Sequence, residues 1–342
     1  MNELNNREES ILKSTVKSFI HSATPVGSGT LVQNSETGLG SASVRRIMAE
    51  LEEKGYLLQP HTSAGRIPTT NGYRYYVNEL MELNGLSQPV RTKIDQTIQK
   101  YSYQAESFPQ DLSDVLAEIS RQLGIVLRPK LEQILFKRIQ VVPSQSNKMM
   151  VLLFGKDDFM QSTLLSISTR LNKLKLQAVL HKINNQLNGL PMGTAQQTFN
   201  QIVNELYADA QNIRHFLLEA SRQLFTVKRQ DGYHLTGTRN ILNQPEFSDV
   251  HRVSTLIDLL EDRDILTHFM ENREKPPGIR ITIGGEHSEE RIKACTVITS
   301  TYHFGQVSGV IGVIGPTRMP YGTIIPLVDY TARAISRNFG IC

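Results

Sequence analysis

The chain has 342 residues, more than a single hydrophobic core usually supports, so two or three domains are expected. Hydrophobic residues make up 39% of the chain and charged residues 20%, which argues against a disordered or fibrous protein. The formal net charge of +4 permits an anionic partner but does not require one.

Neither the start of the chain nor its cysteines indicate secretion. Residues 2–8 are mostly polar where a signal peptide needs an apolar run, and no apolar run elsewhere is long enough to span a bilayer. Cys295 and Cys342 are too few for a disulfide framework or a cysteine-rich metal site. We therefore expect a cytoplasmic protein without a membrane segment.

Three short helices are predicted at the start of the chain. Between residues 7 and 21 apolar residues recur at the spacing of one helix face, and Pro25 should end this helix. A second helix is predicted around residues 31–32, and the third begins at the N-cap candidates Ser41 and Ser43.

The third helix has the clearest pattern, and a hairpin is predicted after it. Four apolar residues repeat at i, i+3, i+4 and i+7: Val44, Ile47, Met48 and Leu51. Gly55 should end the helix, and residues 56–59 and 66–67 are predicted to form two short strands around a polar tip. Thr69 or Thr70 then caps a fourth helix.

The tyrosines of the fourth helix leave two interpretations open. Tyr73, Tyr75 and Tyr76 are able to stack on nucleic-acid bases, or they pack in the core of the domain. Two of them lie on the apolar face of the helix, which favours core packing.

The rest of the chain mixes helices and strands. Helical patterns continue to about Arg128. Strands are predicted on both sides of a helical segment: 134–142, 149–154, 159–167, 279–283, 294–300 and 306–314. The helical segment, 171–227, is interpreted as an inserted module, and further helices are predicted at 253–269 and 325–339. One sheet, split in the sequence by the insertion, is therefore expected.

Three short helices followed by a polar hairpin are the parts of a winged helix-turn-helix, whose third helix enters the major groove of DNA. Arg45 and Arg46 lie in the first turn of that helix, where such helices meet base edges, and its acidic residues lie at the far end. The first 85 residues carry eight Lys and Arg against nine Asp and Glu. A small helical domain with an ordinary solvated face therefore remains the alternative.

The predicted DNA contacts come from the third helix and the hairpin. Arg45 or Arg46 is expected to read guanine by a bidentate contact, and Ser41 and Ser43 to contact phosphate. The hairpin residues expected to hold the DNA backbone or minor groove are His61, Thr62, Ser63 and Arg66.

Residues 47–76 closely resemble the heat-inducible transcription repressors of the HrcA type. The most specific motifs are PHTSAGRIPT and the GYRYYV that follows it. Further similarity lies in residues 235–260, with a TRNILNQPEF core, and in residues 284–334, with GVIGVIGPTRMPY and LVDYTA. Arg46 and Ile47 depart from the family, which commonly has Asn and Glu there, so the extra arginine either adds a phosphate contact or changes a base preference.

The resemblance implies a multidomain α+β fold. It places a winged helix-turn-helix at 1–84, linker helices and the first part of a GAF-like α/β domain at 85–168, an inserted helical dimerisation domain at 169–232, and the rest of the GAF-like domain at 233–342. It also implies a homodimer that binds an inverted-repeat operator in double-stranded DNA and represses heat-shock operons. The chaperonin would keep the repressor active, and heat stress would release the operator as unfolded clients occupy the chaperonin.

Other chemistry has weaker support. Gly309, Gly312 and Gly315 are spaced by three, which faintly suggests a phosphate loop, but no Lys-Ser or Lys-Thr and no helix start follows, so a strand end and turn at Pro316 is favoured. His287, Cys295 and His303 match no ordinary zinc pattern, and a buried strand cysteine is favoured. Because no catalytic motif is found, we expect neither an enzyme nor a cofactor.

Two alternatives remain open. In the first, the GAF-like domain binds a small effector that controls DNA binding. In the second, the helical insertion mainly docks other proteins, and DNA binding is secondary. The insertion has an apolar cluster that is either the dimer interface, as we favour, or core: Leu171, Leu174, Leu176, Val179 and Leu180.

Overall fold

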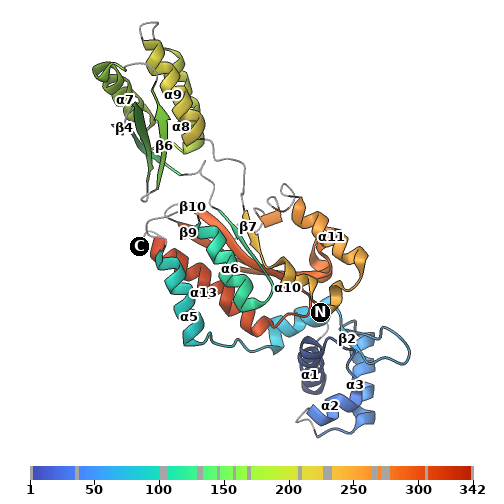
Figure 1. Cartoon of the computed structure of the whole chain (residues 1–342). Coiled ribbons are helices and arrows are strands. Elements are labelled where there is room, and N and C mark those ends of the chain that lie inside the picture. Colours follow the sequence, from blue (N-terminus) through green and yellow to red (C-terminus); the bar gives the residue numbers. More distant parts are fainter. Residues whose placement is uncertain are drawn as a thin grey trace. The chain divides into compact units, whose positions relative to one another are not determined.

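In the computed structural model the chain forms two compact units (Figure 1). The first unit comprises Met1–Leu127, Tyr233–Thr301 and Val310–Ala334; the second comprises Arg128–Gly232, Tyr302–Gly309 and Ile335–Cys342. The structure describes residues 3–34, 38–100, 107–128, 134–144, 147–156, 159–167, 171–206, 210–225, 233–262, 266, 269–270, 278–304 and 307–339. Cys342 lies outside these residues.

The first unit starts with the predicted helices and hairpin, in the predicted order. Their bounds are α1 (Asn6–Ser22), α2 (Ser28–Asn34), α3 (Ser41–Glu53), β1 (Leu57–Leu58), β2 (Ile67–Pro68), α4 (Thr70–Tyr75) and the single π-turn η1 (Tyr76–Leu80). The N-cap of α3 is Gly40, so the predicted cap at Ser41 or Ser43 is wrong. Gly55 follows the helix with φ +79°, as its predicted role as a terminator requires.

An apolar seam and one ion pair hold α1 on α3. Leu12, Val44 and Leu51 are fully buried in this small core. The Lys54 Nζ lies 2.6 Å from the Glu8 carboxylate, which is 3% exposed. Burial by itself raises the pKa of Glu8, but hydrogen bonds from Lys54 and from the backbone N–H of Asn5 outweigh it and hold that pKa below its ordinary value.

One strand that precedes residues 128–232 and four that follow them form a five-stranded sheet in the order β7-β3-β10-β9-β8. Their bounds are β3 (Leu123–Leu127), β7 (Tyr233–Thr236), β8 (Ile279–Ile283), β9 (Cys295–Phe304) and β10 (Val307–Pro316). β3 is antiparallel to both β7 and β10, with Ile125 opposite Gly312 in the β10 register. β3 and β10 are therefore neighbours in the sheet, although about 180 residues separate them in the sequence.

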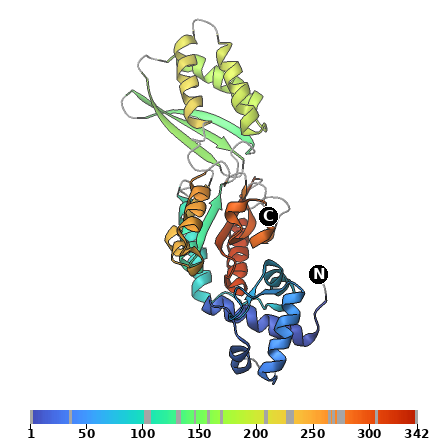
Figure 2. The ribbon, with the colours of Figure 1, turned by 90° about the vertical axis from the view of Figure 1, so that its right-hand side faces the viewer.

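Helices cover both faces of this sheet, as Figures 1 and 2 show for α11 and α13 on opposite sides of the strands. The helices are α5 (Gln88–Gln99), α6 (Phe108–Ser120), α10 (Thr238–Leu242), α11 (Val250–Glu261) and α13 (Tyr321–Phe339), with short 3₁₀ turns η5 (Pro245–Phe247), η6 (Gly284–Glu286) and η7 (Glu290–Ile292). Leu123 and Ile125 pack with Leu256 of α11 on one face. On the other, a Cβ at Gly124 would lie 2.2 Å from the Ser113 carbonyl oxygen of α6.

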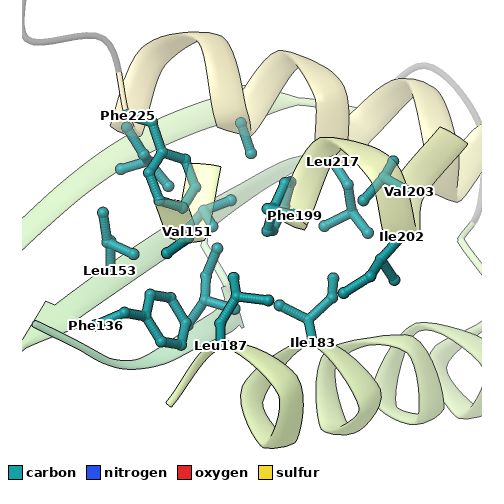
Figure 3. Packing of buried hydrophobic residues seen from close by; sticks show 14 of the residues in the cluster. Phe136, Val151, Leu153, Ile183, Leu187, Phe199, Ile202, Val203, Leu217 and Phe225 are labelled. Carbon is teal, nitrogen blue, oxygen red and sulfur yellow. The ribbon is translucent and has the colours of Figure 1, made fainter. Parts of the chain in front are cut away.

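The second unit has its own sheet, in the order β4-β5-β6, and three helices. Their bounds are β4 (Phe136–Pro143), β5 (Lys148–Gly155), β6 (Met160–Ser166), α7 (Lys173–Leu187), α8 (Met192–Asn204) and α9 (Gln211–Leu224). Figure 3 shows Val151 and Leu153 of the sheet facing Phe199, Leu217 and Phe225 of the helices. The side chain of Asn184 bonds both the N–H and the carbonyl of Ile139, at 2.7 and 3.0 Å, which occupies part of the β4 edge.

Three predictions from the sequence differ from this architecture. The strands predicted at 134–167 exist, but among the described residues they pair with one another and not with the strands after residue 278, so the expected split sheet is not formed. The second unit accordingly begins at Arg128, whereas the inserted helical module was expected from residue 169. β3 lies where a helical pattern was expected, because five consecutive buried residues carry no period that separates strand from helix.

Candidate nucleic-acid interface

The exposed side of α3 carries the residues that the sequence singled out. Val44 and Ile47 of this helix are buried, whereas Ser41, Ser43 and Arg45 are exposed, as is Arg46. The difference follows from the helical period, which separates the two sets by about half a turn. Cations and hydroxyls therefore line the first turns of α3 on its solvent side.

The polar side chains on this face make one weak ion pair and one hydroxyl contact that the structure describes. Arg46 is 77% exposed, and its Nε lies 3.5 Å from the Glu50 carboxylate one turn further along, a geometry worth little in solvent. The hydroxyls of Ser41 and Ser28 lie 3.1 Å apart, which links the starts of α3 and α2. Arg46 is thus able to turn from Glu50 to another anion at small cost.

The hairpin tip presents three more predicted residues. His61, Thr62 and Ser63 are all exposed. The backbone beneath them is ordered by Gln59, whose Nε2 donates to the carbonyls of Thr62 and Ala64 at 3.1 and 3.0 Å. Nothing in the composition of the tip indicated this role for Gln59, because it depends on the folded shape of the loop.

Arg66 lies in a different environment from the one that the sequence predicts. Its side chain is 14% exposed, and its Nε donates to the Glu52 carboxylate at 2.8 Å. The other carboxylate oxygen of Glu52 accepts the Gln59 N–H at 3.2 Å. The Arg66 backbone pairs with Val26 through two hydrogen bonds of 2.9 Å. Arg66 therefore ties the hairpin to the end of α3 and to the segment before α2.

Two glycines allow the close approaches on which the hairpin depends. A Cβ at Gly65 would lie 2.4 Å from the carbonyl of Val26, and a Cβ at Gly72 would lie 2.2 Å from the Tyr56 carbonyl oxygen. Real Cβ atoms do not come this close to backbone, so a larger residue requires the chain to move. These contacts explain the glycines in the two most specific motifs.

The three tyrosines pack in the core rather than face solvent. Tyr73, Tyr75 and Tyr76 are 2%, 9% and 6% exposed, which confirms the favoured interpretation. Tyr75 donates to the Glu9 carboxylate at 2.7 Å, and burial, followed by that hydrogen bond, raises its pKa to about 12. Stacking of these rings on bases is not compatible with this packing.

The other candidate sites have structural explanations. Gly312 and Gly315 lie within β10, which ends at Pro316 as predicted, and a Cβ at Gly312 would lie 2.5 Å from the Ile298 carbonyl oxygen of the next strand. Cys295 is fully buried at the start of β9, and burial raises its pKa to about 12. Across the described part of the chain, no cluster of three or more His, Cys, Asp or Glu side chains is arranged to hold a metal ion, and no helix is long and apolar enough to cross a membrane.

Comparison with known proteins gives the family. Residues 106–325 match the model of the HrcA protein C-terminal domain. The chain belongs to the HrcA family. Curated HrcA proteins named heat-inducible transcription repressors include one from Chlorobium chlorochromatii, 33% identical over 99% of this chain and 98% of its own, and one from Bacillus pumilus, 33% identical over 97% of both. HrcA proteins are transcription repressors and not enzymes, and the similarity supports a heat-inducible transcription repressor.

A solved structure has the same fold. It is the 2.2 Å crystal structure of a hypothetical protein, which matches with a TM-score of 0.70 and 21% identity over 98% of this chain and 99% of the other. The mixed α+β architecture is therefore shared by the two chains along their whole length.

Replacing Arg66 by Ala is expected to weaken the attachment of the hairpin to α3. The free energy of unfolding should fall by about 1–3 kcal/mol, because a largely buried hydrogen bond to a charged group is lost. The salt dependence of DNA binding should stay unchanged, because the guanidinium faces Glu52 and not solvent. Denaturant unfolding and a salt titration of binding measure the two effects.

The matched control is Arg46→Ala. Its exposed guanidinium predicts a stability change within about 0.5 kcal/mol and a log–log salt slope smaller by about one. A smaller slope for Arg66→Ala with unchanged stability would show instead that Arg66 contacts phosphate.

Proposed function

We propose that α1, α2, α3 and the β1–β2 hairpin form a winged helix-turn-helix that binds an inverted-repeat operator. The observation that carries this proposal is the shared exposure of two groups of residues: Ser41, Ser43, Arg45 and Arg46 on α3, and His61, Thr62 and Ser63 on the hairpin tip. Helix α3 is the recognition helix, and the hairpin is the wing.

Within this interface the residues have different tasks. Arg45 or Arg46 reads guanine in the major groove by two parallel hydrogen bonds, a contact worth about 1–3 kcal/mol of discrimination. Ser41 and Ser43 lie at the N-terminus of α3, where hydroxyls and backbone N–H groups favour a phosphate. The wing tip holds the backbone or minor groove, and Arg66 positions the wing through Glu52.

The other two domains are proposed from the division of the chain into two units. We assign the five-stranded sheet and its helices to the GAF-like domain, and the second unit to the inserted dimerisation domain. The long separation in sequence between β3 and β10 supports a slow folding step during which apolar surface is exposed. This gives a physical reason for dependence on the chaperonin in the cytoplasm: the folded, operator-binding population falls when unfolded clients occupy the chaperonin during heat stress.

The dimer interface lies on the solvent side of the β4-β5-β6 sheet. Val142, Met150 and Leu164 are direct cross-strand neighbours there and are 42%, 37% and 48% exposed. Met160, on the same side, is 56% exposed. An exposed apolar row of this kind marks an interaction surface, and a second copy presents the same row across a two-fold axis.

The apolar cluster around α7 fits a dimer interface less well. Leu176 is 5% exposed, and Leu171, Val179 and Leu180 pack against the core of the second unit. Leu174 is 79% exposed and is the exception.

Binding to a duplex with the family inverted repeat tests the operator proposal. A dimer with roughly eight phosphate contacts should give a log–log salt slope of about −7. Arg45→Ala or Arg46→Ala should weaken binding to the repeat more than binding to a scrambled duplex. A flat salt dependence, or equal losses on both duplexes, would contradict the assigned roles; recovery of binding by a small molecule would favour an effector site in the GAF-like domain.

Met150→Lys tests the dimer interface. It places a charge at the centre of the apolar row and should shift the protein toward monomer in sedimentation at micromolar concentration, because an unpaired charge in a buried interface is costly. Leu174→Lys is the matched control and should leave the dimer intact. Dissociation by Leu174→Lys alone would place the interface on α7.

Chaperonin dependence predicts a repressor that loses operator binding on standing. Addition of chaperonin with ATP should restore binding, because it returns aggregation-prone chains to the folded state. The measurement is the fraction of protein competent for operator binding through repeated heating cycles. Full recovery in every cycle without chaperonin would reject this mechanism.

A further inference from the structure

Three sequence motifs that do not contribute to the DNA-facing surface meet within the first unit. They are GYRYYV on α4 and η1, TRNILNQPEF on α10 and η5, and GPTRMPY between β10 and α13. They are separated by up to about 240 residues along the chain, yet two side-chain contacts join them: the hydrogen bond from Arg318 to Gln244 and the packing of Tyr73 against Tyr321. Their meeting point is the junction between the N-terminal helices and the five-stranded domain.

Arg318 of GPTRMPY is the central side chain of this junction. Its guanidinium donates to the carbonyl of Ile20 at 3.1 Å and to the Gln244 Oε1 at 2.9 Å, and it forms an ion pair with Glu246. The Arg318 side chain is 12% exposed. Ile20 lies in the last turn of α1, where carbonyls lack helical partners and a cation is favoured by the helix dipole. The Arg318 guanidinium thus joins the end of α1 to the turn after α10.

Arg74 makes a second, independent connection from α4. Its guanidinium binds both carboxylate oxygens of Glu286 and also donates to the Ile281 carbonyl of β8 at 2.8 Å. Burial by itself raises the pKa of Glu286, but hydrogen bonds from Arg74 and from the Ile283 N–H hold it below its ordinary value. The carboxylate is therefore charged near neutral pH, and the bidentate pair is formed.

Apolar and backbone contacts complete the junction. The rings of Tyr73 and Tyr321 lie 6.0 Å apart, and both side chains are buried. The Asn84 N–H donates to the Gly322 carbonyl at 2.8 Å. The Gly285 N–H donates to the Thr70 hydroxyl at 3.2 Å. A junction made of packed rings and directional hydrogen bonds has one preferred geometry.

Helix α4 transmits this geometry to the hairpin. On the side away from Arg74, the Thr69 hydroxyl donates to the Gly55 carbonyl at 2.7 Å, and Gly72 touches the Tyr56 carbonyl. The same short helix therefore contacts the base of the hairpin and the five-stranded domain. A change in the orientation of α4 on the five-stranded domain would therefore move the hairpin and α3 together.

We propose that Arg318 and Arg74 are positioning residues that hold the DNA-binding helices in one orientation on the five-stranded domain, so that both half-sites of an operator are engaged at once. This inference rests on the proposed function. Binding of the second half-site by an already bound dimer depends on effective concentration, which falls when the binding unit pivots freely. A rigid junction raises that concentration and also makes the distance between half-sites part of the specificity.

The test compares Arg318→Gln and Arg74→Gln with the wild type on three duplexes. One carries the family inverted repeat, one a single half-site, and one the repeat with its half-sites moved apart by about 5 base pairs, half a helical turn. The matched control is Arg333→Gln, since Arg333 pairs with Asp329 on α13 but is 75% exposed.

For the wild type and the control we expect the intact repeat to bind at least about 100-fold more tightly than the half-site. In both junction variants this ratio should fall by about tenfold, the penalty for the moved half-sites should shrink, and half-site affinity should stay within about twofold. Hydrogen exchange supplies a readout without DNA: the Gly285 and Asn84 amides should exchange faster, while those of α3 keep their protection.

The outcomes separate the two proposals. An unchanged ratio and spacing penalty in both variants would overturn the positioning role while operator binding stands. Equal losses on repeat and half-site, with α3 amides still protected, would overturn it too, because the arginines would then act on the half-site itself. If Arg318→Gln unfolds the N-terminal helices, Arg74→Gln, whose side chain is more exposed, decides the question. Absence of wild-type binding to every duplex would refute the proposed function, and this inference with it.

Discussion

The close approach of α4 to the hairpin is the constraint on which the N-terminal part of the molecule depends. It requires a residue without a side chain at Gly72, because any Cβ there would collide with the Tyr56 carbonyl. Since α4 is short, its other side chains reach the five-stranded domain directly, where Arg74 and Tyr73 are bound. Helix α4 therefore fixes both the shape of the hairpin and the position of the hairpin relative to the five-stranded domain.

Charge in the N-terminal helices is used in two distinct ways. Exposed cations on α3 remain available to an anion, as the long 3.5 Å contact of Arg46 with Glu50 indicates. Largely buried cations, such as Arg66 and Arg318, are instead paired with carboxylates and carbonyls inside the structure. Because a buried arginine that loses its partner is strongly destabilising, this second group maintains shape, and the first is free for recognition.

The second unit is stabilised by its own core, which Figure 3 shows between the strands and the three helices. Among the described residues of this unit, helices pack on one face of its sheet, and the opposite face carries Val142, Met150 and Leu164. Asn184 saturates part of one sheet edge, which disfavours the addition of a further strand there.

The sequence by itself determined the local elements and the family. Helical periodicity predicted α1, α3 with its buried side, and α4. Gly55, Pro316 and Thr69 predicted correct ends and caps, because these signals act over only a few residues. Motifs such as PHTSAGRIPT carried the family resemblance directly. The exposed position of the α3 and hairpin-tip residues followed from the same short-range patterns.

Only the tertiary structure decided which strands pair and which arginines are available. The segments of β4 to β6 and of β8 to β10 are both rich in Val, Ile, Leu and Phe, which predicts strands in each, yet the two sets form separate sheets, since such composition specifies a strand but not its neighbour. The sequence does not distinguish Arg66 from Arg46, but the folded hairpin brings Arg66 to Glu52. Arg318 contacts the Ile20 carbonyl of α1, which lies nearly three hundred residues earlier in the chain. Such partners depend on long-range packing, which no window of local sequence contains.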